Sequence, residues 1–327
     1  MKTVALTGAT GFIGSHVARA LIQTDHPLHL YVRRTNPLIR RLQRQGARVF
    51  VGTGADDVPM LRKALEEADT VIHCAAAIKA MSRRAFYQAN VAFTERVLSL
   101  SGRHQRFLFI SSQAAVGPSP GGIPLDETAR PAPVNAYGWS KLRAERIIRA
   151  WGREHDRRYL ILRPSVVYGP GEKDVFLLFK GIRKGVAFLP GNGRQRVSFL
   201  HVDDLVRAIL AALERKPKGE TFFVTGDEPA SWLELARLIQ TALSKHRILT
   251  LRLPVSLTGT AAFFADALST MRGKPAIFCR DKVLEMRQEA WLCSNRRIEE
   301  RLSWKPQVSL REGVEKTAAW YLDQHWI

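Results

Sequence analysis

The segment Thr7-Gly8-Ala9-Thr10-Gly11-Phe12-Ile13-Gly14 decides the fold of this 327-residue sequence. A short apolar run, residues 2–6, precedes it and an amphipathic run, residues 15–22, follows it, so the order is strand, glycine turn, helix. We expect the first glycine to allow the tight turn, the second to let the backbone approach a pyrophosphate, and the third to let the helix pack closely on the strand. The segment therefore predicts a dinucleotide-binding turn, with Gly-x-x-Gly-x-x-Gly spacing.

Strands and helices continue to alternate up to about residue 151. This alternation predicts an α/β fold with a Rossmann-type, doubly wound parallel sheet and a smaller, mostly C-terminal substrate-binding lobe. The expected dinucleotide-binding domain comprises residues 1–170, with returning elements at about 197–227. The substrate-binding lobe is expected to be discontinuous, from residues 171–196 and 228–327. Within it, the apolar residues 254–270, which include Phe263 and Phe264, are expected to cover the substrate pocket or to rest on a bilayer.

Two arginines, Arg33 and Arg34, directly follow the expected second strand, residues 28–32. In a dinucleotide-binding fold, the residue that reads the adenosine ribose lies about 20 residues beyond the glycines. An acidic residue there favours NAD(H), whereas an arginine can pair with a 2′-phosphate. The sequence therefore favours NADP(H) as cofactor, with NAD(H) as the alternative. If the arginines only face solvent in this basic chain, they indicate no preference between NADP(H) and NAD(H).

Tyr137 and Lys141 form a Tyr-x-x-x-Lys pair. Residues four apart on a helix project from one face, so the ammonium can lower the pKa of the phenol and hold a nicotinamide ribose. Tyr137 then becomes a plausible proton donor and acceptor near neutral pH. Chance supplies many such pairs, so the interpretation depends on the glycine turn and on an upstream serine.

Further segments follow in a characteristic order: His73-Cys74-Ala75-Ala76-Ala77, Asn90-Val91, Ser111-Ser112, Leu162-Arg163-Pro164, Val167-Tyr168-Gly169-Pro170-Gly171, Phe199-Leu200-His201-Val202-Asp203-Asp204 and Trp304-Lys305-Pro306. Over nearly its whole length the chain resembles the extended short-chain dehydrogenase/reductase superfamily, also called the NAD-dependent epimerase/dehydratase family. The resemblance implies that Ser112, at the family's spacing before Gly117, joins Tyr137 and Lys141 as the third catalytic residue. It also implies a homodimer formed through a four-helix interface.

The same resemblance implies which residues contact the cofactor. They come from the glycine turn, the two arginines, the tyrosine and lysine, and the ends of later strands. The residues are Gly8, Thr10, Gly11, Phe12, Ile13, Gly14, Arg33, Arg34, Ala75, Ala76, Asn90, Tyr137, Lys141, Pro164, Val166 and Val167.

The residues around the expected substrate site separate the reaction classes of the family. The sugar-nucleotide 4,6-dehydratases of the family have Thr-Asp-Glu where this chain has Ser112, Gln113 and Ala114. The resemblance therefore disfavours a dehydratase, which needs an acid and a base to remove water. Epimerases usually carry an asparagine and an arginine where this chain has Val166 and Val197, so two diphosphate-gripping positions are apolar. The pattern is more similar to the 3β-hydroxysteroid dehydrogenase and dihydroflavonol reductase branches, which act on bulky, lipophilic alcohols or ketones. The candidate substrate contacts are Gln113, Val166, Val197, Arg194 and Arg196.

The main prediction is an NADP(H)-dependent oxidoreductase that interconverts a secondary alcohol and a ketone on a bulky, lipophilic substrate. Tyr137 would pass the proton, Lys141 would hold the ribose, and Ser112 would hydrogen-bond the substrate oxygen. One alternative is an NAD-dependent nucleotide-sugar epimerase that uses the same three residues. Another is a noncatalytic dinucleotide-sensing or nucleic-acid-binding protein, although the intact triad argues against it.

Composition favours an enzyme in the cytoplasm. Hydrophobic residues make up 46% of the chain, which excludes wholesale disorder, and no uninterrupted apolar run has spanning length. The three cysteines have no zinc-ligand spacing, so no metal site is predicted. The net charge of +20 attracts polyanions, but the basic residues lack interleaved aromatics, which disfavours nucleic acid. Peripheral contact with a membrane surface is the better specific alternative to a merely solvated basic surface.

Overall fold

The fold is described from a computed structural model that covers residues 2–54, 57–154, 156–253 and 280–327. The predicted apolar stretch at residues 254–270 lies outside the described residues. No helix in the described ranges is both long enough and apolar enough to cross a membrane.

A seven-stranded sheet forms the centre of the larger domain, and all of its strand pairs are parallel. The strand order, β11-β6-β5-β4-β1-β2-β3, reverses direction next to β1 and confirms the predicted Rossmann-type sheet. In chain order the strands are β1 (Val4–Thr7), β2 (Leu28–Val32), β3 (Arg48–Val51), β4 (Thr70–His73), β5 (Arg106–Ile110), β6 (Arg158–Pro164) and β11 (Glu220–Val224). β1, β2, β4 and β5 are buried along their whole length because helices cover both faces of the sheet.

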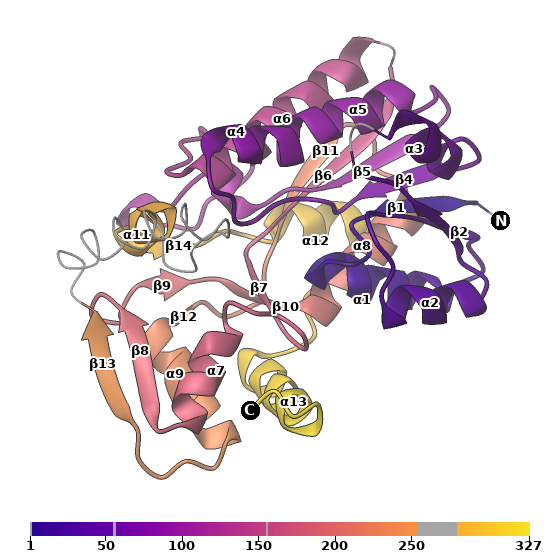
Figure 1. The fold of residues 1–327 in the computed structure, drawn as a ribbon. Helices are drawn as coiled ribbons and strands as arrows, with labels where there is room; N and C mark the ends of the chain where they lie inside the picture. Colours follow the sequence, from indigo (N-terminus) through magenta and orange to yellow (C-terminus); the bar gives the residue numbers. More distant parts are fainter. Residues whose placement is uncertain (1, 55–56, 155, 254–279) are drawn as a thin grey trace.

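Helices lie on both faces of this sheet (Figure 1). One face packs against α3 (Val58–Leu65), α5 (Phe93–Leu100) and α6 (Ala136–Glu154). The other packs against α1 (Phe12–Leu21), α2 (Pro37–Arg44), α8 (Val202–Arg215) and α12 (Arg296–Leu302). α12 was expected in the substrate-binding lobe. It lies on the sheet instead, because Ile298, Leu302 and the following Trp304 are buried in the same hydrophobic cluster as α8 and β11.

The smaller lobe has a hydrophobic core of its own. Its elements are α7 (Phe176–Arg183), β8 (Val186–Pro190), β9 (Arg196–Val197), β12 (Ala230–Ser231), α9 (Trp232–Ala242), β13 (Leu249–Leu253), β14 (Ala290–Trp291) and α13 (Leu310–Asp323). α9 begins with a capping box in which Ser231 and Glu234 satisfy each other's backbone amides. The elements of this lobe are discontinuous in sequence, because α8 and β11 return to the sheet between β9 and β12.

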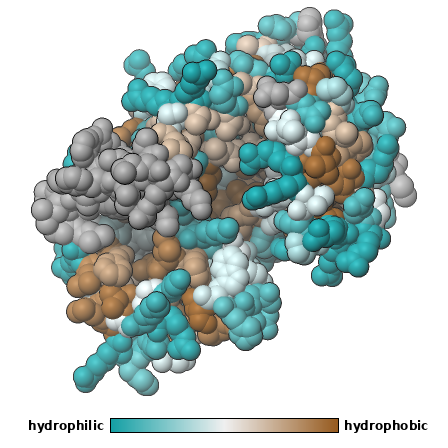
Figure 2. Space-filling view, viewed as in Figure 1, coloured by the Kyte–Doolittle hydropathy of each residue, from teal (hydrophilic) through white to brown (hydrophobic). Residues whose placement is uncertain are grey.

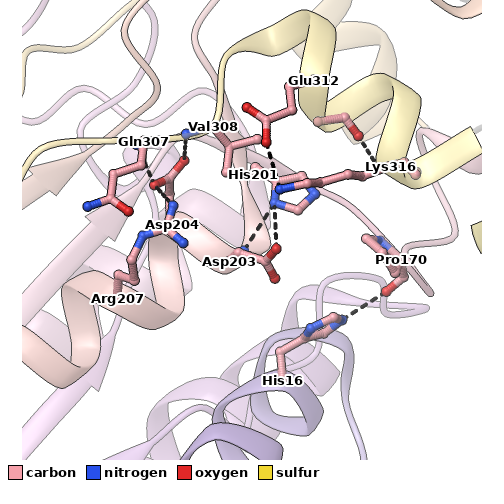
Figure 3. Close-up of polar contacts among 12 residues, drawn as sticks. His16, Pro170, His201, Asp203, Asp204, Arg207, Gln307, Val308, Glu312 and Lys316 are labelled. Carbon is pink, nitrogen blue, oxygen red and sulfur yellow. Dashed lines mark hydrogen bonds and ion pairs between the residues drawn. The ribbon is translucent and has the colours of Figure 1, made fainter. Parts of the chain in front are cut away.

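Polar contacts link the start of α8, which follows β10 (Phe199–His201), to the segment before α13 (Figure 3). The carboxylate of Asp204 accepts hydrogen bonds from the backbone amides of Gln307, at 2.7 Å, and Val308, at 3.0 Å. His16 on α1 contacts the carbonyl oxygen of Pro170 at 2.9 Å. These contacts fix the chain before α13, and the loop after β7 (Val166–Tyr168), against the nucleotide domain.

Candidate active site

The glycine turn has the geometry that the sequence predicted. Gly8 adopts φ +82°, and a Cβ atom there would lie 2.6 Å from the backbone nitrogen of Ala75. A Cβ atom on Gly14 would lie 2.2 Å from the carbonyl oxygen of Gly8, so α1 packs directly on the turn. Gly11 is the N-cap of α1, and no side chain caps the first amides of the helix. These amides are available to a phosphate group, so the turn fits a dinucleotide.

Other predicted cofactor residues lie along the same edge of the sheet, at the carboxyl ends of the strands. Arg33 and Arg34 follow β2, are exposed, and form no ion pair within the described ranges. Ala75 and Ala76 follow β4. The remaining three lie at the end of β6 and in β7: Pro164, Val166 and Val167. Ligands of open α/β sheets bind at this edge, beside the point where the strand order reverses.

The side chain of Asn90 links two segments of the nucleotide domain through hydrogen bonds. It lies in a π-helical turn, Tyr87–Ala92, a local irregularity that is frequent at functional sites. Its side-chain oxygen accepts a 2.7 Å hydrogen bond from the amide of Ala77, and its nitrogen donates to the carbonyl of Ala77 and to the hydroxyl of Ser140. Asn90 therefore ties the loop after β4 to α6, beside Lys141. Its predicted contact with the cofactor stays a prediction.

The structure distinguishes the two adjacent serines. Ser111 is buried, and its hydroxyl donates a 2.6 Å hydrogen bond to the carboxylate of Glu145, which is also paired with Arg163. Ser112 follows β5, lines a cavity, and hydrogen-bonds with the hydroxyl of Tyr137. Tyr137 projects into the same cavity from the first turn of α6. The geometry therefore places Ser112, and not Ser111, beside the tyrosine.

The protonation of Tyr137 differs from the expectation. Burial raises the pKa of Tyr137 to about 12, opposed by the Ser112 hydrogen bond and reinforced by the carboxylate of Glu285. The ammonium of Lys141 is held elsewhere: its Nζ donates a 2.6 Å hydrogen bond to the carbonyl of Ile110 and lies 4.3 Å from the centre of the Phe109 ring. Burial lowers the pKa of Lys141 to about 8. At neutral pH Tyr137 is therefore a phenol, ready to donate a proton.

The cavity beside Ser112 and Tyr137 has a volume of about 450 Å³. Most of its wall is apolar or aromatic, and several of the apolar side chains come from the smaller lobe. The wall includes Val166, Leu178, Val197, Trp232, Met286 and Trp291. Such a wall suits a bulky apolar ligand whose one polar group meets the two hydroxyls.

Polar and charged side chains also line the cavity, and most of the charged ones pair with one another. Each cation that lines the cavity in the described ranges is paired with a carboxylate: Lys79 with Asp174, and Lys282 with Glu285 at 2.8 Å. Gln113 is buried, and its amide nitrogen has no hydrogen-bond partner in the described part of the chain. A ligand in the cavity can therefore take up this donor.

Only some of the five candidate substrate residues line the cavity. Gln113, Val166 and Val197 line the cavity. Arg196 alternates with Val197 along β9, so it is exposed and donates to the carbonyl of Pro229. Arg194 is also exposed and lines a second hollow, which shares Pro190, Gln195 and Met286 with the cavity. Neither arginine reaches the wall of the cavity.

Sequence reasoning missed α11 (Arg280–Met286), which packs against the start of α6. Glu285 accepts a 2.6 Å hydrogen bond from Asn135, whose own oxygen accepts from the amide of Gly138. Asp281 accepts from the amide of Ala136 at 3.2 Å. α11 therefore holds the turn that carries Tyr137. No local pattern could reveal this, because Asn135 and Glu285 are 150 positions apart.

A parallel doubly wound sheet, a glycine turn at its edge and a Ser112–Tyr137 pair facing a cavity define a dinucleotide-dependent enzyme of the extended short-chain dehydrogenase/reductase type. Residues 4–225 match the NAD dependent epimerase/dehydratase family, and the chain belongs to that family. The noncatalytic alternative is thereby disfavoured.

Relatives in this family span nearly the whole chain. A ceramide reductase of Caulobacter vibrioides is 29% identical over 99% of this chain and 96% of that protein. A UDP-glucose 4-epimerase of Vibrio cholerae is 26% identical over 98% of this chain and 96% of that protein. The crystal structure of a dTDP-glucose 4,6-dehydratase of Bacillus anthracis in complex with NAD superimposes with a TM-score of 0.82 at 20% identity, covering 100% of this chain and 98% of that one. The family that this chain belongs to is described as NAD dependent, and the Bacillus anthracis structure holds NAD.

Proposed function

We propose that this protein is an NADP(H)-dependent oxidoreductase that interconverts a secondary alcohol and a ketone on a bulky, lipophilic substrate. The observation that carries the proposal is the largely apolar cavity that ends at Ser112 and Tyr137. A nucleotide sugar would bring a diphosphate, which needs cationic partners. Among the described residues, the two cations of the wall, Lys79 and Lys282, are each paired with a carboxylate, and Arg194 and Arg196 do not line the cavity.

Arg33 and Arg34 support NADP(H). They are exposed, follow β2 where the adenosine ribose is read, and have no acidic partner in the described ranges. A 2′-phosphate at this place would form charge-assisted hydrogen bonds with them. The named dehydratase structure contains NAD, so the preference for NADP(H) is this proposal's own.

In ketone reduction, Tyr137 donates its phenolic proton to the carbonyl oxygen of the substrate. The hydroxyl of Ser112 hydrogen-bonds to the same oxygen as negative charge develops on it. The bound cofactor supplies the hydride. Lys141, buried behind Tyr137, would hold the nicotinamide ribose. Gln113 offers its amide to a second polar atom of the substrate.

A nucleotide-sugar epimerase is the second candidate, favoured by the 26% identity to the epimerase of Vibrio cholerae over nearly the whole chain. It would use the same Ser112, Tyr137 and Lys141, with tightly held NAD. The ceramide reductase, at 29% identity, is in turn consistent with a lipophilic substrate.

A thermal-shift screen, followed by turnover assays, separates the two candidates. With NADPH present, sterol-like or flavonoid-like ketones should stabilise the protein more than UDP-glucose does, because only the apolar ligands bury their surface in this cavity. Ketones that stabilise the protein should also be reduced. Tyr137→Phe is the control for chemistry, since it should keep the stabilisation and lose turnover. Stabilisation and turnover by nucleotide sugars alone would reverse the assignment.

A homodimer, location in the cytoplasm and peripheral contact with a membrane stay predictions of the same proposal. Sedimentation velocity of the purified protein tests the dimer.

A further inference from the structure

The cavity opens onto an apolar rim. Leu177 and Phe188 line the cavity, yet 43% and 56% of their surfaces are exposed. On β13, Leu251 lies opposite Phe188 and is 37% exposed, and Leu249, two residues earlier, is 60% exposed. Figure 2 shows hydrophobic residues gathered at the lower left, over β8 and β13, with hydrophilic side chains extending beside them. We call these four residues the apolar rim.

Isolated exposed leucines are normal on a protein surface. The members of the apolar rim are different because three of them share one face of a two-stranded parallel ribbon and two of them continue into the cavity wall. A contiguous apolar surface with a polar border is typical of an interaction site.

The two segments that form the apolar rim are rich in cations and contain no acidic residue. Residues 176–190 and 244–252 contain Lys180, Arg183, Lys184, Lys245, Arg247 and Arg252, and neither segment contains Asp or Glu. Arg183 and Lys184 are exposed at the end of α7, immediately before β8. Arg252 is exposed on β13 but follows Leu251 directly, so it lies on the opposite face of the strand. The border of the apolar rim at the end of α7 is therefore positive, within a chain whose net charge is +20, whereas Asp174 and Glu285 line the cavity behind the rim.

We propose that the apolar rim and its cations dock on an anionic phospholipid bilayer, so that a lipophilic substrate passes from the bilayer directly into the cavity. Exposed apolar side chains inside a basic border are the combination that holds a protein in the interface of an anionic membrane. The passage of substrate rests on the proposed function, whereas the docking does not.

A second copy of the chain fits this surface less well. A two-fold contact would place the same patch on both protomers and bring the two sets of cations together. Such like-charge contacts oppose association unless anions intervene. The lipid headgroups of an anionic bilayer supply those anions.

Docking is tested by co-sedimentation of the full chain with vesicles of phosphatidylcholine alone or mixed with phosphatidylglycerol. We expect binding to the anionic vesicles, weakening as salt rises, and little binding to phosphatidylcholine. Arg183→Glu with Lys184→Glu, and separately Leu249→Ser with Leu251→Ser, should each reduce binding about tenfold or more. Arg40→Glu with Arg44→Glu on α2 is the matched control for total charge and should bind nearly as the natural chain does.

Three results would overturn the docking surface: equal binding to both vesicle types, equal loss in the α2 control, or unchanged binding in both rim variants. Melting temperatures and circular dichroism verify that the variants fold. A change of oligomeric state in the rim variants, with vesicle binding intact, would assign the surface to a second copy instead.

Passage of substrate is tested with one ketone dissolved in vesicles and a short, water-soluble ketone. Arg183→Glu with Lys184→Glu should slow reduction of the vesicle-borne ketone severalfold and leave reduction of the soluble ketone unchanged. Equal rates on the vesicle-borne ketone would refute direct passage. If the proposed function were wrong, neither ketone would be reduced while vesicle binding persisted, so the two failures are distinguishable.

Discussion

The two walls of the cavity are built in different ways. The wall that carries the chemistry comes from two segments near one another in the chain, the turn after β5 and the first turns of α6, and it ends in the hydroxyls of Ser112 and Tyr137. The opposite wall is assembled from α7, β8, β9, α9, α11 and β14, and is mostly apolar. The comparison teaches that proton transfer depends on a few close residues, whereas the choice of substrate depends on many distant ones.

Replacing the phenol should have the largest effect. Tyr137→Phe removes only the proton-carrying oxygen, so turnover should fall by about 10²-fold to 10⁴-fold while cofactor binding is preserved. Steady-state rates and a fluorescence titration of NADPH measure the two quantities. Tyr87→Phe, outside the cavity lining, is the matched control and should retain activity. Near-normal turnover by Tyr137→Phe would refute the proton-transfer role.

The next effect concerns the cofactor. Arg33→Gln with Arg34→Gln should weaken NADP(H) binding by about tenfold to 100-fold, since a hydrogen bond to a charged group contributes about 1.5 to 3 kcal/mol. NAD(H) binding should change little, because NAD lacks the 2′-phosphate. Calorimetric Kd values for both cofactors decide the point, with Arg40→Gln and Arg44→Gln as the control pair. An equal loss of affinity for the two cofactors would show that the arginines act only through nonspecific electrostatic attraction and do not bind the 2′-phosphate.

A smaller effect should come from replacing Gln113, whose buried amide lies in the largely apolar wall of the cavity. Gln113→Leu removes a buried donor that has no partner in the described chain, so thermal stability should stay equal or rise. KM for the ketone should increase by about twofold to tenfold, the value of one neutral hydrogen bond. Gln195→Leu is the contrast: its amide already donates to the carbonyls of Glu285 and Gln288, so its loss should lower the melting temperature. If KM is unchanged in Gln113→Leu, Gln113 does not touch the substrate.

The smallest effect concerns pH. The carboxylate of Glu285 raises the pKa of Tyr137, so Glu285→Gln should lower that pKa. Alcohol oxidation needs the phenolate, and its activity should therefore begin to rise at a lower pH in the variant, by less than about one unit. Ketone reduction, which needs the phenol, should lose activity earlier on the alkaline side. Glu300→Gln, which removes an exposed carboxylate from α12, should leave both profiles in place.

Local sequence signals were sufficient for the wall that carries the chemistry. The glycine turn and the doubly wound sheet follow from short motifs and regular alternation, and the structure has both. The structure also places Ser112 beside Tyr137, while its catalytic role stays a prediction. The helical spacing of Tyr137 and Lys141 was also sound. What the spacing could not give is the direction of the Lys141 ammonium, which the carbonyl of Ile110 and the ring of Phe109 hold behind the tyrosine.

By itself, the sequence determined the class of the sheet, and it predicted the place of the dinucleotide and the proton-carrying residue, because each of these depends on residues close together in the chain. Only the tertiary structure decided the apolar cavity, the packing of α12 on the sheet, the position of Glu285 beside Tyr137 and the apolar rim formed with β8 and β13. These features require contacts between segments far apart in the chain. Such contacts are selected by the packing of the whole core, and no local periodicity encodes them.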